Sequence, residues 1–238
     1  SFSHSNEAQN LSGYKKKYLN ETLLDYKRKG FGLSKEKRDS VKDIFNSLSD
    51  LGIEFNKNIS VYQDTLFVSE DEVDGLPENY KKEREMPDGT FAIDMSYPSY
   101  IPFMDLSESD QAREKLRYKF NNRAVPANLD VLNNIIRKRR ELVSVLGYNS
   151  YTEYRTEDRM AKNPKNVWDF ENDLQTKLRS KSKRDIQKML TKKSERTDKD
   201  ASTIHPWEAG FYENLILKED FDLDQEEVRK YFEFNNVT

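Results

Sequence analysis

The stretch LVSVLGYNSYTEYRTEDRMAK, residues 142–162, predicts two closely spaced joints between helices. A first helix is expected to end just before Gly147, because glycine adopts a positive φ without a clash at Cβ. Asn149 or Ser150 can cap a second helix that continues to the end of the stretch. The Asn-Pro step that follows places Pro164 at the first position of a third helix. The stretch therefore predicts a corner in a helical fold.

Three tyrosines gather around this corner. Tyr151 and Tyr154 are three positions apart, which places them on one face of the second helix. Tyr148 can fold back on the end of the first helix, and Arg159 belongs to the charged residues around the rest of the second. Packing and capping explain these four residues without any chemistry.

The composition points to a mainly α protein. The chain has 238 residues, of which 35% are hydrophobic and 35% charged, with only 8 glycines and 7 prolines. So few turn-forming residues argue against disorder and against an all-β fold. We expect a disordered or poorly ordered start at residues 1–10 and an elongated multi-helix domain at residues 11–238. Residues 96–107 are a candidate sub-boundary within that domain.

Apolar residues that recur every three or four positions locate the helices. The clearest pattern follows Ser34, and its apolar positions are Val41, Ile44, Phe45, Leu48, Leu51, Phe55 and Ile59. The helix that starts at Pro164 is expected to turn four apolar side chains inward. These are Val167, Phe170, Leu174 and Leu178.

One short β-hairpin is expected near residues 82–95. Met86-Pro87-Asp88-Gly89 is a turn signature, and Phe91, Ile93 and Met95 alternate with polar or small residues after it. Thr65 to Val68 is only a short β-prone link. The predicted fold class is therefore mainly α with one short hairpin.

Three blocks of the sequence, taken in order, resemble a known family. They are LGIEFNKNIS at residues 51–60, LGYNSYTEYRTEDRMAKNPKNV at 146–167 and HPWEAGFYENLILKEDFDLDQEEVRKYFEFNNVT at 205–238. In the last block Asp224 and Glu227 form a capping box, and the block ends in Val237-Thr238. These blocks are similar to the thimet-type zinc oligopeptidases, the family that includes thimet oligopeptidase, neurolysin and the fungal saccharolysins.

The resemblance implies a function that this chain does not perform alone. Members of the family bind one zinc ion and cut internal bonds of oligopeptides, and their helices form one wall of a deep, narrow channel. Such a channel admits short, unstructured peptides and excludes folded proteins. For Tyr148, Tyr151, Tyr154 and Arg159, the resemblance implies contact with a peptide in the channel as the alternative to packing. The resemblance implies zinc as the cofactor of the parent protein, oligopeptides as its partners, a monomer, and a location in the cytoplasm or the mitochondrial intermembrane space.

The chain lacks the residues that such a zinc site needs. A zinc peptidase of this kind requires two histidines one helical turn apart, with a glutamate between them as general base. The chain has 2 histidines, His4 and His205, and therefore no HExxH motif. It also has no cysteine, which excludes thiolate metal sites. We expect no catalytic residue and no metal ligand in the chain. The resemblance implies that it lies upstream of the zinc motif.

A basic run offers an alternative function. Its residues are Lys177, Arg179, Lys181, Lys183, Arg184 and Lys188. A solvated helix face explains them, while a self-standing helical module that binds acidic partners is the alternative interpretation. We expect no nucleic-acid partner, because the run lacks interleaved aromatic residues and the whole chain has a net charge of −3. We expect no membrane association, because no apolar run approaches the roughly 18 residues of a membrane helix.

Overall fold

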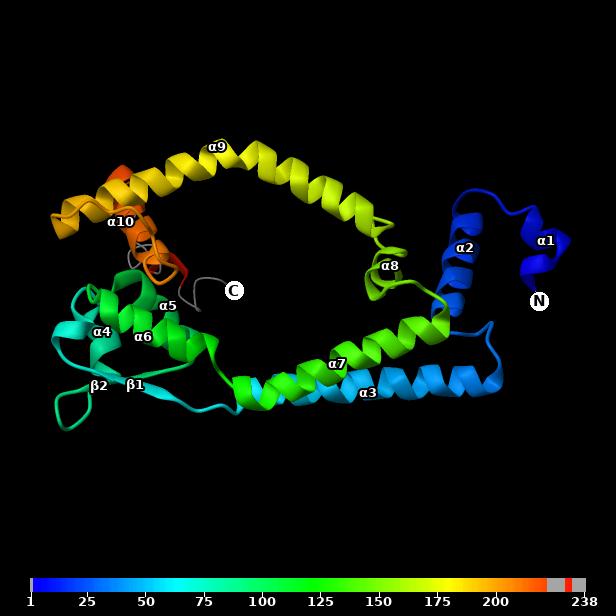
Figure 1. The fold of residues 1–238 in the computed structure, drawn as a ribbon, viewed down its shortest axis with the longest axis horizontal. Coiled ribbons are helices and arrows are strands. Elements are labelled where there is room, and N and C mark those ends of the chain that lie inside the picture. The colour runs from blue at the N-terminus through cyan, green and yellow to red at the C-terminus, as the bar shows by residue number, and fades with distance from the viewer. Residues whose placement is uncertain (1, 222–229, 233–238) are drawn as a thin grey trace. The chain divides into compact units, whose positions relative to one another are not determined.

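The computed structural model describes residues 2–221 and 230–232, and its secondary structure is mainly helical, as predicted (Figure 1). The α-helices are α1 (Asn6–Gln9), α2 (Gly13–Arg28), α3 (Lys35–Ser60), α4 (Glu78–Lys82), α5 (Tyr97–Leu106), α6 (Asp110–Asn121), α7 (Val125–Leu146), α8 (Tyr151–Thr156), α9 (Pro164–Thr197) and α10 (Ala209–Phe221). The 3-10 helices are η1 (Phe2–His4), η2 (Asp71–Val73) and η3 (Lys230–Phe232), and the strands are β1 (Thr65–Val68) and β2 (Phe91–Asp94). The expected capping box of Asp224 and Glu227 and the exit at Val237 lie outside the described residues.

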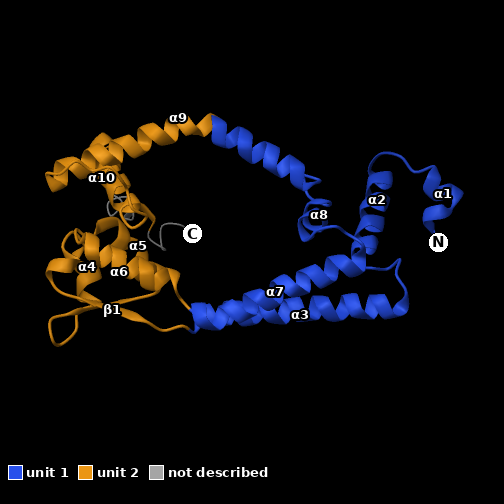
Figure 2. Ribbon diagram, in the orientation of Figure 1, with its two compact units in different colours: residues 1–61, 124–176 blue, residues 62–123, 177–238 orange. Residues whose placement is uncertain are grey.

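The chain divides into two compact units, each built from two separate segments (Figure 2). Unit 1 comprises residues 1–61 and 124–176, and unit 2 comprises residues 62–123 and 177–238. The candidate sub-boundary at residues 96–107 lies within unit 2 and stays a prediction. The same holds for the poorly ordered start, where the structure places η1 and α1.

Unit 1 is organised around α3 and α7, which pack side by side and run antiparallel (Figure 1). The predicted helix after Ser34 is present as α3, and its Val41 and Ile44 are buried against Leu142 and Val143 of α7. At the other end of the pair, Asn128 is buried and its amide nitrogen donates to the Phe55 carbonyl oxygen at 3.1 Å. The helix pair therefore combines an apolar seam with a satisfied polar contact.

The predicted corner is present at the end of α7. Gly147 has φ 80°, and the Tyr148 N–H donates to the Val143 carbonyl oxygen at 2.9 Å, which closes the helix end. The Ser150 hydroxyl accepts from the Glu153 N–H and caps α8. Asn163 caps α9 in the same way, through the N–H of Asn166 at 2.9 Å.

The prediction that the second helix would reach residue 162 is wrong, because α8 ends at Thr156. The carbonyl oxygen of Tyr154 accepts a hydrogen bond from the Arg28 guanidinium. A continuing helix would use that same oxygen to accept the N–H four residues later. After α8 the chain follows tight turns, in which the Arg159 N–H donates to the Thr156 carbonyl oxygen at 3.0 Å.

Unit 2 contains the predicted hairpin turn and a two-stranded antiparallel sheet. The Gly89 N–H donates to the Met86 carbonyl oxygen at 2.9 Å, and an isolated bridge joins Glu85 to Phe91 across the turn. The longer ladder pairs β2 with β1, from Thr65 opposite Asp94 to Val68 opposite Phe91. The link at residues 65–68 is thus a strand of the sheet.

The core of unit 2 lies between this sheet and the helices α5 and α6. Its most deeply buried side chains are Ile93 from β2, Phe103 from α5, and Ala112 and Leu116 from α6. The alternation along β2 buries Phe91 and Ile93 and leaves Asp94 exposed, which matches the period of a strand with one buried face.

Candidate functional site

The structure brings the three predicted tyrosines together in unit 1. The Tyr148 ring meets the Tyr154 ring edge to face, with centroids 5.3 Å apart, and the Tyr151 centroid lies 6.0 Å from that of Tyr154. Tyr154 is buried, and the guanidinium of Arg139 lies 4.9 Å from the Tyr151 ring centroid. Edge-to-face pairs of this kind stabilise beyond the area that they bury. We call Tyr148, Tyr151 and Tyr154 the tyrosine cluster.

Arg28 fastens the tyrosine cluster to α2, and sequence analysis missed it. Its side chain is buried, its guanidinium lies 4.1 Å from the centroid of the Tyr154 ring, and it donates to the Tyr154 carbonyl oxygen. The same guanidinium lies 3.5 Å from Glu157 and 3.4 Å from Asp158. Two carboxylates therefore balance a charge that would be costly to bury alone.

Glu157 and Tyr148 influence each other's ionisation. Burial tends to raise the pKa of Glu157, but hydrogen bonds from the Tyr148 hydroxyl and from Lys27 outweigh it, so the pKa is lowered. Burial, and then the hydrogen bond to Glu157, raises the pKa of Tyr148 well above its ordinary range. At neutral pH the Tyr148 hydroxyl thus remains a donor and Glu157 remains an acceptor.

Arg159 lies apart from this hydrogen-bonded group. Its side chain is exposed, and its Nε is 3.7 Å from Asp158. Tyr148 and Tyr154, by contrast, contact Lys27 and Arg28 of α2 through their rings. Of the four residues predicted around the corner, Arg159 is therefore the one with an exposed side chain.

The predicted basic face lies along α9. All six of its residues are exposed, but some already have acidic neighbours. Lys181 pairs with Asp185 at 2.5 Å, and within unit 2 Lys188 pairs with Asp220 of α10 at 3.1 Å. Lys192, one turn further on, contacts both Glu195 and Glu219. Acidic side chains therefore lie beside this face at Lys181 and again where α10 approaches.

The prediction that α9 turns Phe170, Leu174 and Leu178 inward is wrong for the described structure, where all three side chains are exposed. Val167 is half-buried. The periodicity that predicted a buried face is real, but neither hydrophobic core contains these residues.

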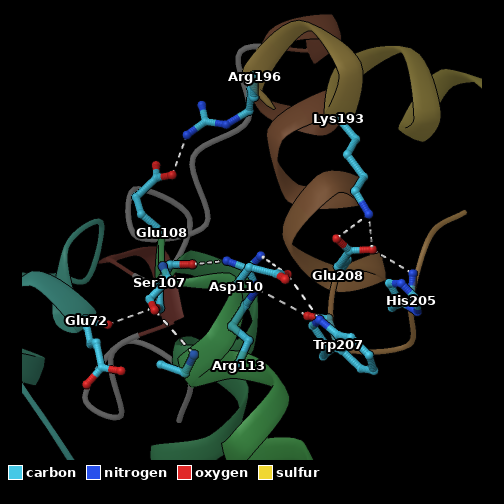
Figure 3. A network of polar contacts seen from close by, with 12 residues as sticks. Glu72, Ser107, Glu108, Asp110, Arg113, Lys193, Arg196, His205, Trp207 and Glu208 are labelled. Carbon is cyan, nitrogen blue, oxygen red and sulfur yellow. Dashed lines mark hydrogen bonds and ion pairs between the residues drawn. The ribbon is translucent and has the colours of Figure 1, made fainter. Parts of the chain in front are cut away.

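In unit 2 the segment His205 to Glu208, which precedes α10, packs against α6 through a buried arginine, Arg113 (Figure 3). Arg113 is only 1% exposed, and it donates to the carbonyl oxygens of Ser107 and, at 3.2 Å, of Trp207. It also pairs with Asp110 at 3.0 Å and lies 4.1 Å from the Phe211 ring centroid. Burial lowers the pKa of Arg113, with Asp110 acting against that effect.

A second buried charge secures the end of α9 to the same segment. Glu208 is buried, and its carboxylate lies 2.6 Å from Lys193 Nζ and accepts from the His205 N–H at 2.7 Å (Figure 3). The His205 ring stacks on Trp207, with centroids 4.4 Å apart. The network of Arg113 and Glu208 thus lies directly before α10, and sequence analysis included Trp207 and Glu208 only as part of the third resembling block.

The described residues do not fit a zinc ion. Among them, no group of three histidine, cysteine, aspartate or glutamate side chains is arranged to hold a metal. His205 instead uses its ring to stack on an indole. In the same part of the chain, no helix is long and apolar enough to cross a lipid bilayer.

Comparisons with known proteins agree with the resemblance. The model of peptidase family M3 matches residues 103–238, which is more than half of the chain. The chain is 29% identical over 227 residues to saccharolysin from Saccharomyces cerevisiae, a match that covers 91% of this chain and 32% of that protein.

Two further relatives give the same result. The thimet-like oligopeptidase of Dictyostelium discoideum is 26% identical over 238 residues, which covers 95% of this chain and 35% of the relative. Oligopeptidase A of Haemophilus influenzae is 28% identical over 250 residues, which covers 98% of this chain and 36% of the relative. The chain thus spans about a third of the length of the relatives that it matches. On the strength of the family match, this chain belongs to peptidase family M3.

Proposed function

We propose that the chain is a non-catalytic, helical part of a zinc-dependent oligopeptidase. The parent protein hydrolyses short, unstructured peptides within a narrow channel, and these helices contribute to the channel wall. The observation that carries the proposal is the family match over residues 103–238, together with relatives that are named as oligopeptidases. We place the parent protein in the cytoplasm or the mitochondrial intermembrane space, as a monomer.

In this proposal the chain supplies structure, and the rest of the parent protein supplies catalysis. Its described residues supply rigid packing, through the antiparallel pair of α3 and α7 and through the buried charges of Arg28 and Arg113. Peptide-bond hydrolysis by a metallopeptidase requires a metal-activated water and a general base. In this proposal those groups belong to residues of the parent protein outside this chain.

The tyrosine cluster is our candidate for contact with peptide. Tyr151 is half-buried and keeps part of its ring accessible, while the exposed Arg159 offers a cation to a peptide carboxylate. Aromatic faces and guanidinium groups contact peptides without reading a particular sequence. That property suits an enzyme that selects substrates by size.

A direct assay tests the proposal. The 238-residue chain and the complete gene product are incubated with a quenched fluorescent oligopeptide, with zinc or with a chelator. We expect turnover by the complete protein only, its loss with the chelator, and its return when zinc is restored. Cleavage by the 238-residue chain alone, or a complete protein that is inactive with zinc present, would contradict the proposal.

The alternative function is a helical module that binds acidic partners, and the exposure of the basic face on α9 is the observation that favours it. An acidic peptide labelled with a fluorophore provides the test. Tight binding to the 238-residue chain that disappears in the double variant Lys181→Gln and Arg184→Gln would support the module. The matched control is Lys35→Gln with Lys37→Gln on α3, which removes the same charge elsewhere.

A further inference from the structure

The sequence contains two Asp–Gly steps, and the structure of unit 2 holds them in contrasting ways. They are Asp74-Gly75 in the turn before α4 and Asp88-Gly89 in the hairpin turn. An Asp–Gly step can rearrange, because the main-chain nitrogen of the glycine can attack the aspartate side chain and close a succinimide ring. Glycine favours this attack, since it has no Cβ beside that nitrogen and its backbone rotates readily. The local structure therefore decides which of the two steps reacts.

Asp74-Gly75 is anchored to the core of unit 2. Leu76, the next residue, is buried in that core. The Asp74 carbonyl oxygen accepts the Glu108 N–H at 2.9 Å, and a Cβ on Gly75 would lie 2.3 Å from the Leu106 carbonyl oxygen. Ring closure requires rotation of the peptide between the aspartate and the glycine. Here that rotation would break the hydrogen bond from Glu108 and disturb a main chain that lies directly against that of Leu106.

Asp88-Gly89 has no comparable anchor in the part of the chain that the structure describes. Every residue from Glu85 to Gly89 is exposed, and a Cβ on Gly89 would meet open space. The Gly89 N–H donates to the Met86 carbonyl oxygen at 2.9 Å, while the turn is also closed by the Met86 N–H, which donates to the Thr90 carbonyl oxygen at 2.8 Å. Segments with few buried apolar contacts open locally at free energies well below that of global unfolding. The peptide of this step can thus rotate while the rest of the hairpin stays paired.

Thr90 opposes the rearrangement of Asp88. Its hydroxyl and its N–H both donate to the Asp88 carboxylate, at 2.7 and 3.0 Å, and these bonds hold the pKa of Asp88 below its ordinary value. The reacting form is the neutral carboxylic acid, because its hydroxyl leaves as water whereas a carboxylate has no such leaving group. Thr90 therefore keeps the side chain ionised and holds it away from the Gly89 nitrogen.

We propose that Asp88-Gly89 is a site of spontaneous covalent modification, at which Asp88 becomes isoaspartate while Asp74 is spared. The Gly89 nitrogen bonds to Cγ of Asp88 and loses its proton, and the carboxyl hydroxyl departs, so that one water is released. A water molecule then opens the ring. Attack at Cγ restores aspartate, whereas attack at the main-chain carbonyl carbon leaves Cγ joined to Gly89 and inserts an extra carbon into the main chain of the turn. The conversion consumes no other reagent.

Ageing of the complete gene product at neutral pH tests the proposal. After digestion, the peptides that carry Asp74 and Asp88 are separated, and isoaspartate is assigned by electron-transfer fragmentation. We expect several-fold more isoaspartate at residue 88 than at residue 74 in the folded protein, and similar amounts at both after unfolding in guanidinium chloride. Equal amounts in the folded protein would overturn the proposal. A difference that persists in the unfolded protein would do the same, because folded structure would then not be its cause.

Two matched variants test the part that Thr90 plays. Thr90→Val removes the hydroxyl donor but keeps the N–H and the size of the side chain, so it should raise the rate at Asp88 several-fold and leave the rate at Asp74 unchanged. Thr65→Val makes the same chemical change at another half-buried threonine of unit 2 and should alter neither rate. An unchanged rate at Asp88 in Thr90→Val contradicts the assigned role. A rise at Asp74 as well would mean general unfolding, and it contradicts the local explanation.

The pH dependence identifies the reacting species. The rate at Asp88 should rise as the pH is lowered from 7 to 5, because the neutral share of a carboxyl grows as the pH approaches its pKa. Asp88→Glu should abolish the product, since a glutamate in its place would have to close a larger ring. A rate that falls toward acid, or a modified product that remains in Asp88→Glu, would show that the succinimide route is wrong.

Discussion

At the scale of single residues, Arg28 is a buried cation of unit 1. Its hydrogen bond and ion pairs cannot be made by an apolar side chain. Arg28→Ala removes the cation between Glu157 and Asp158 and leaves the Tyr154 carbonyl oxygen without this donor. We expect a loss of about 2 kcal/mol in the free energy of unfolding, because the Tyr154 carbonyl oxygen and the half-buried Glu157 carboxylate lose a buried donor. Urea denaturation followed by circular dichroism measures it.

The neighbouring Lys27 provides the control for that prediction. It pairs with Glu157 at 3.3 Å but is exposed. Lys27→Ala should therefore cost less than about 1 kcal/mol. Equal losses for the two variants would show that Arg28 contributes surface charge rather than a buried link.

Asp105 of α5 predicts a dependence of stability on pH. Burial, and then the charge of Glu213, raises the pKa of its carboxyl. A raised pKa means that the folded chain binds the proton more tightly than the unfolded chain does. The stabilisation is complete below the ordinary aspartate pKa of about 3.9 and is lost as the pH rises through the folded value.

Asp105→Asn should therefore raise the melting temperature at pH 7 and change it much less at pH 3.5. Glu213→Gln is the control, because Glu213 is exposed and acts on Asp105 only as a secondary cause. Glu213→Gln should also raise the melting temperature at pH 7, but by a smaller amount. A lower melting temperature for Asp105→Asn at pH 7 would contradict the assigned sign.

Residues such as Arg28 and Arg113 could not be predicted from the sequence. Arg28 meets the Tyr154 carbonyl oxygen across 126 residues of chain, and Arg113 meets the Trp207 carbonyl oxygen across 94. Nothing local marks either arginine, since arginine is usually exposed and is buried only when its partners are present. The tyrosines were predictable because their spacing is a local property of one short helix.

At the scale of elements, the turn before α4 depends on a glycine for two separate reasons. Gly75 has φ 85°, and a Cβ there would lie 2.3 Å from the Leu106 carbonyl oxygen at the end of α5. Gly75→Ala should cost at least about 3 kcal/mol, from the left-handed backbone and the clash with main-chain atoms together. Thermal melts measure the loss.

Gly89 in the hairpin turn isolates the first reason, the left-handed backbone. Its φ is 81°, but a Cβ there would meet open space. Gly89→Ala should therefore cost only the backbone contribution of about 1–2 kcal/mol. If both alanine variants lose the same stability, the close approach of Leu106 is not a real constraint on unit 2.

The elements themselves were largely predictable, and the exceptions have physical causes. The seam of α3, the αL glycine after α7 and the caps of α8 and α9 are encoded by neighbouring residues. The early end of α8 coincides with the hydrogen bond that the Tyr154 carbonyl oxygen accepts from Arg28 of a distant helix. The apolar positions of α9 predicted a buried face, but Phe170, Leu174 and Leu178 are exposed. Periodicity identifies the apolar side of a helix and does not show what packs against it.

At the scale of the whole molecule, metal should have no effect on the stability of this chain alone. Metal binding stabilises a protein only where a set of ligands favours the folded state, and the described residues offer no such set. We expect the same melting temperature in zinc, in a chelator and in neither. A shift of several degrees with zinc would reveal ligands that this account does not include.

The interleaved order of the two units governs how the chain can fold during synthesis. α3 leaves the ribosome long before α7, since all of residues 62–123 are made between them. Until α7 is made, the apolar side of α3 has no native packing partner. Arg113 of α6 likewise lacks its native contact until the segment with Trp207 is made. A nascent chain halted near residue 123 would contain an incomplete unit 1 and an incomplete unit 2. Chaperones bind the apolar surface that such incomplete units expose.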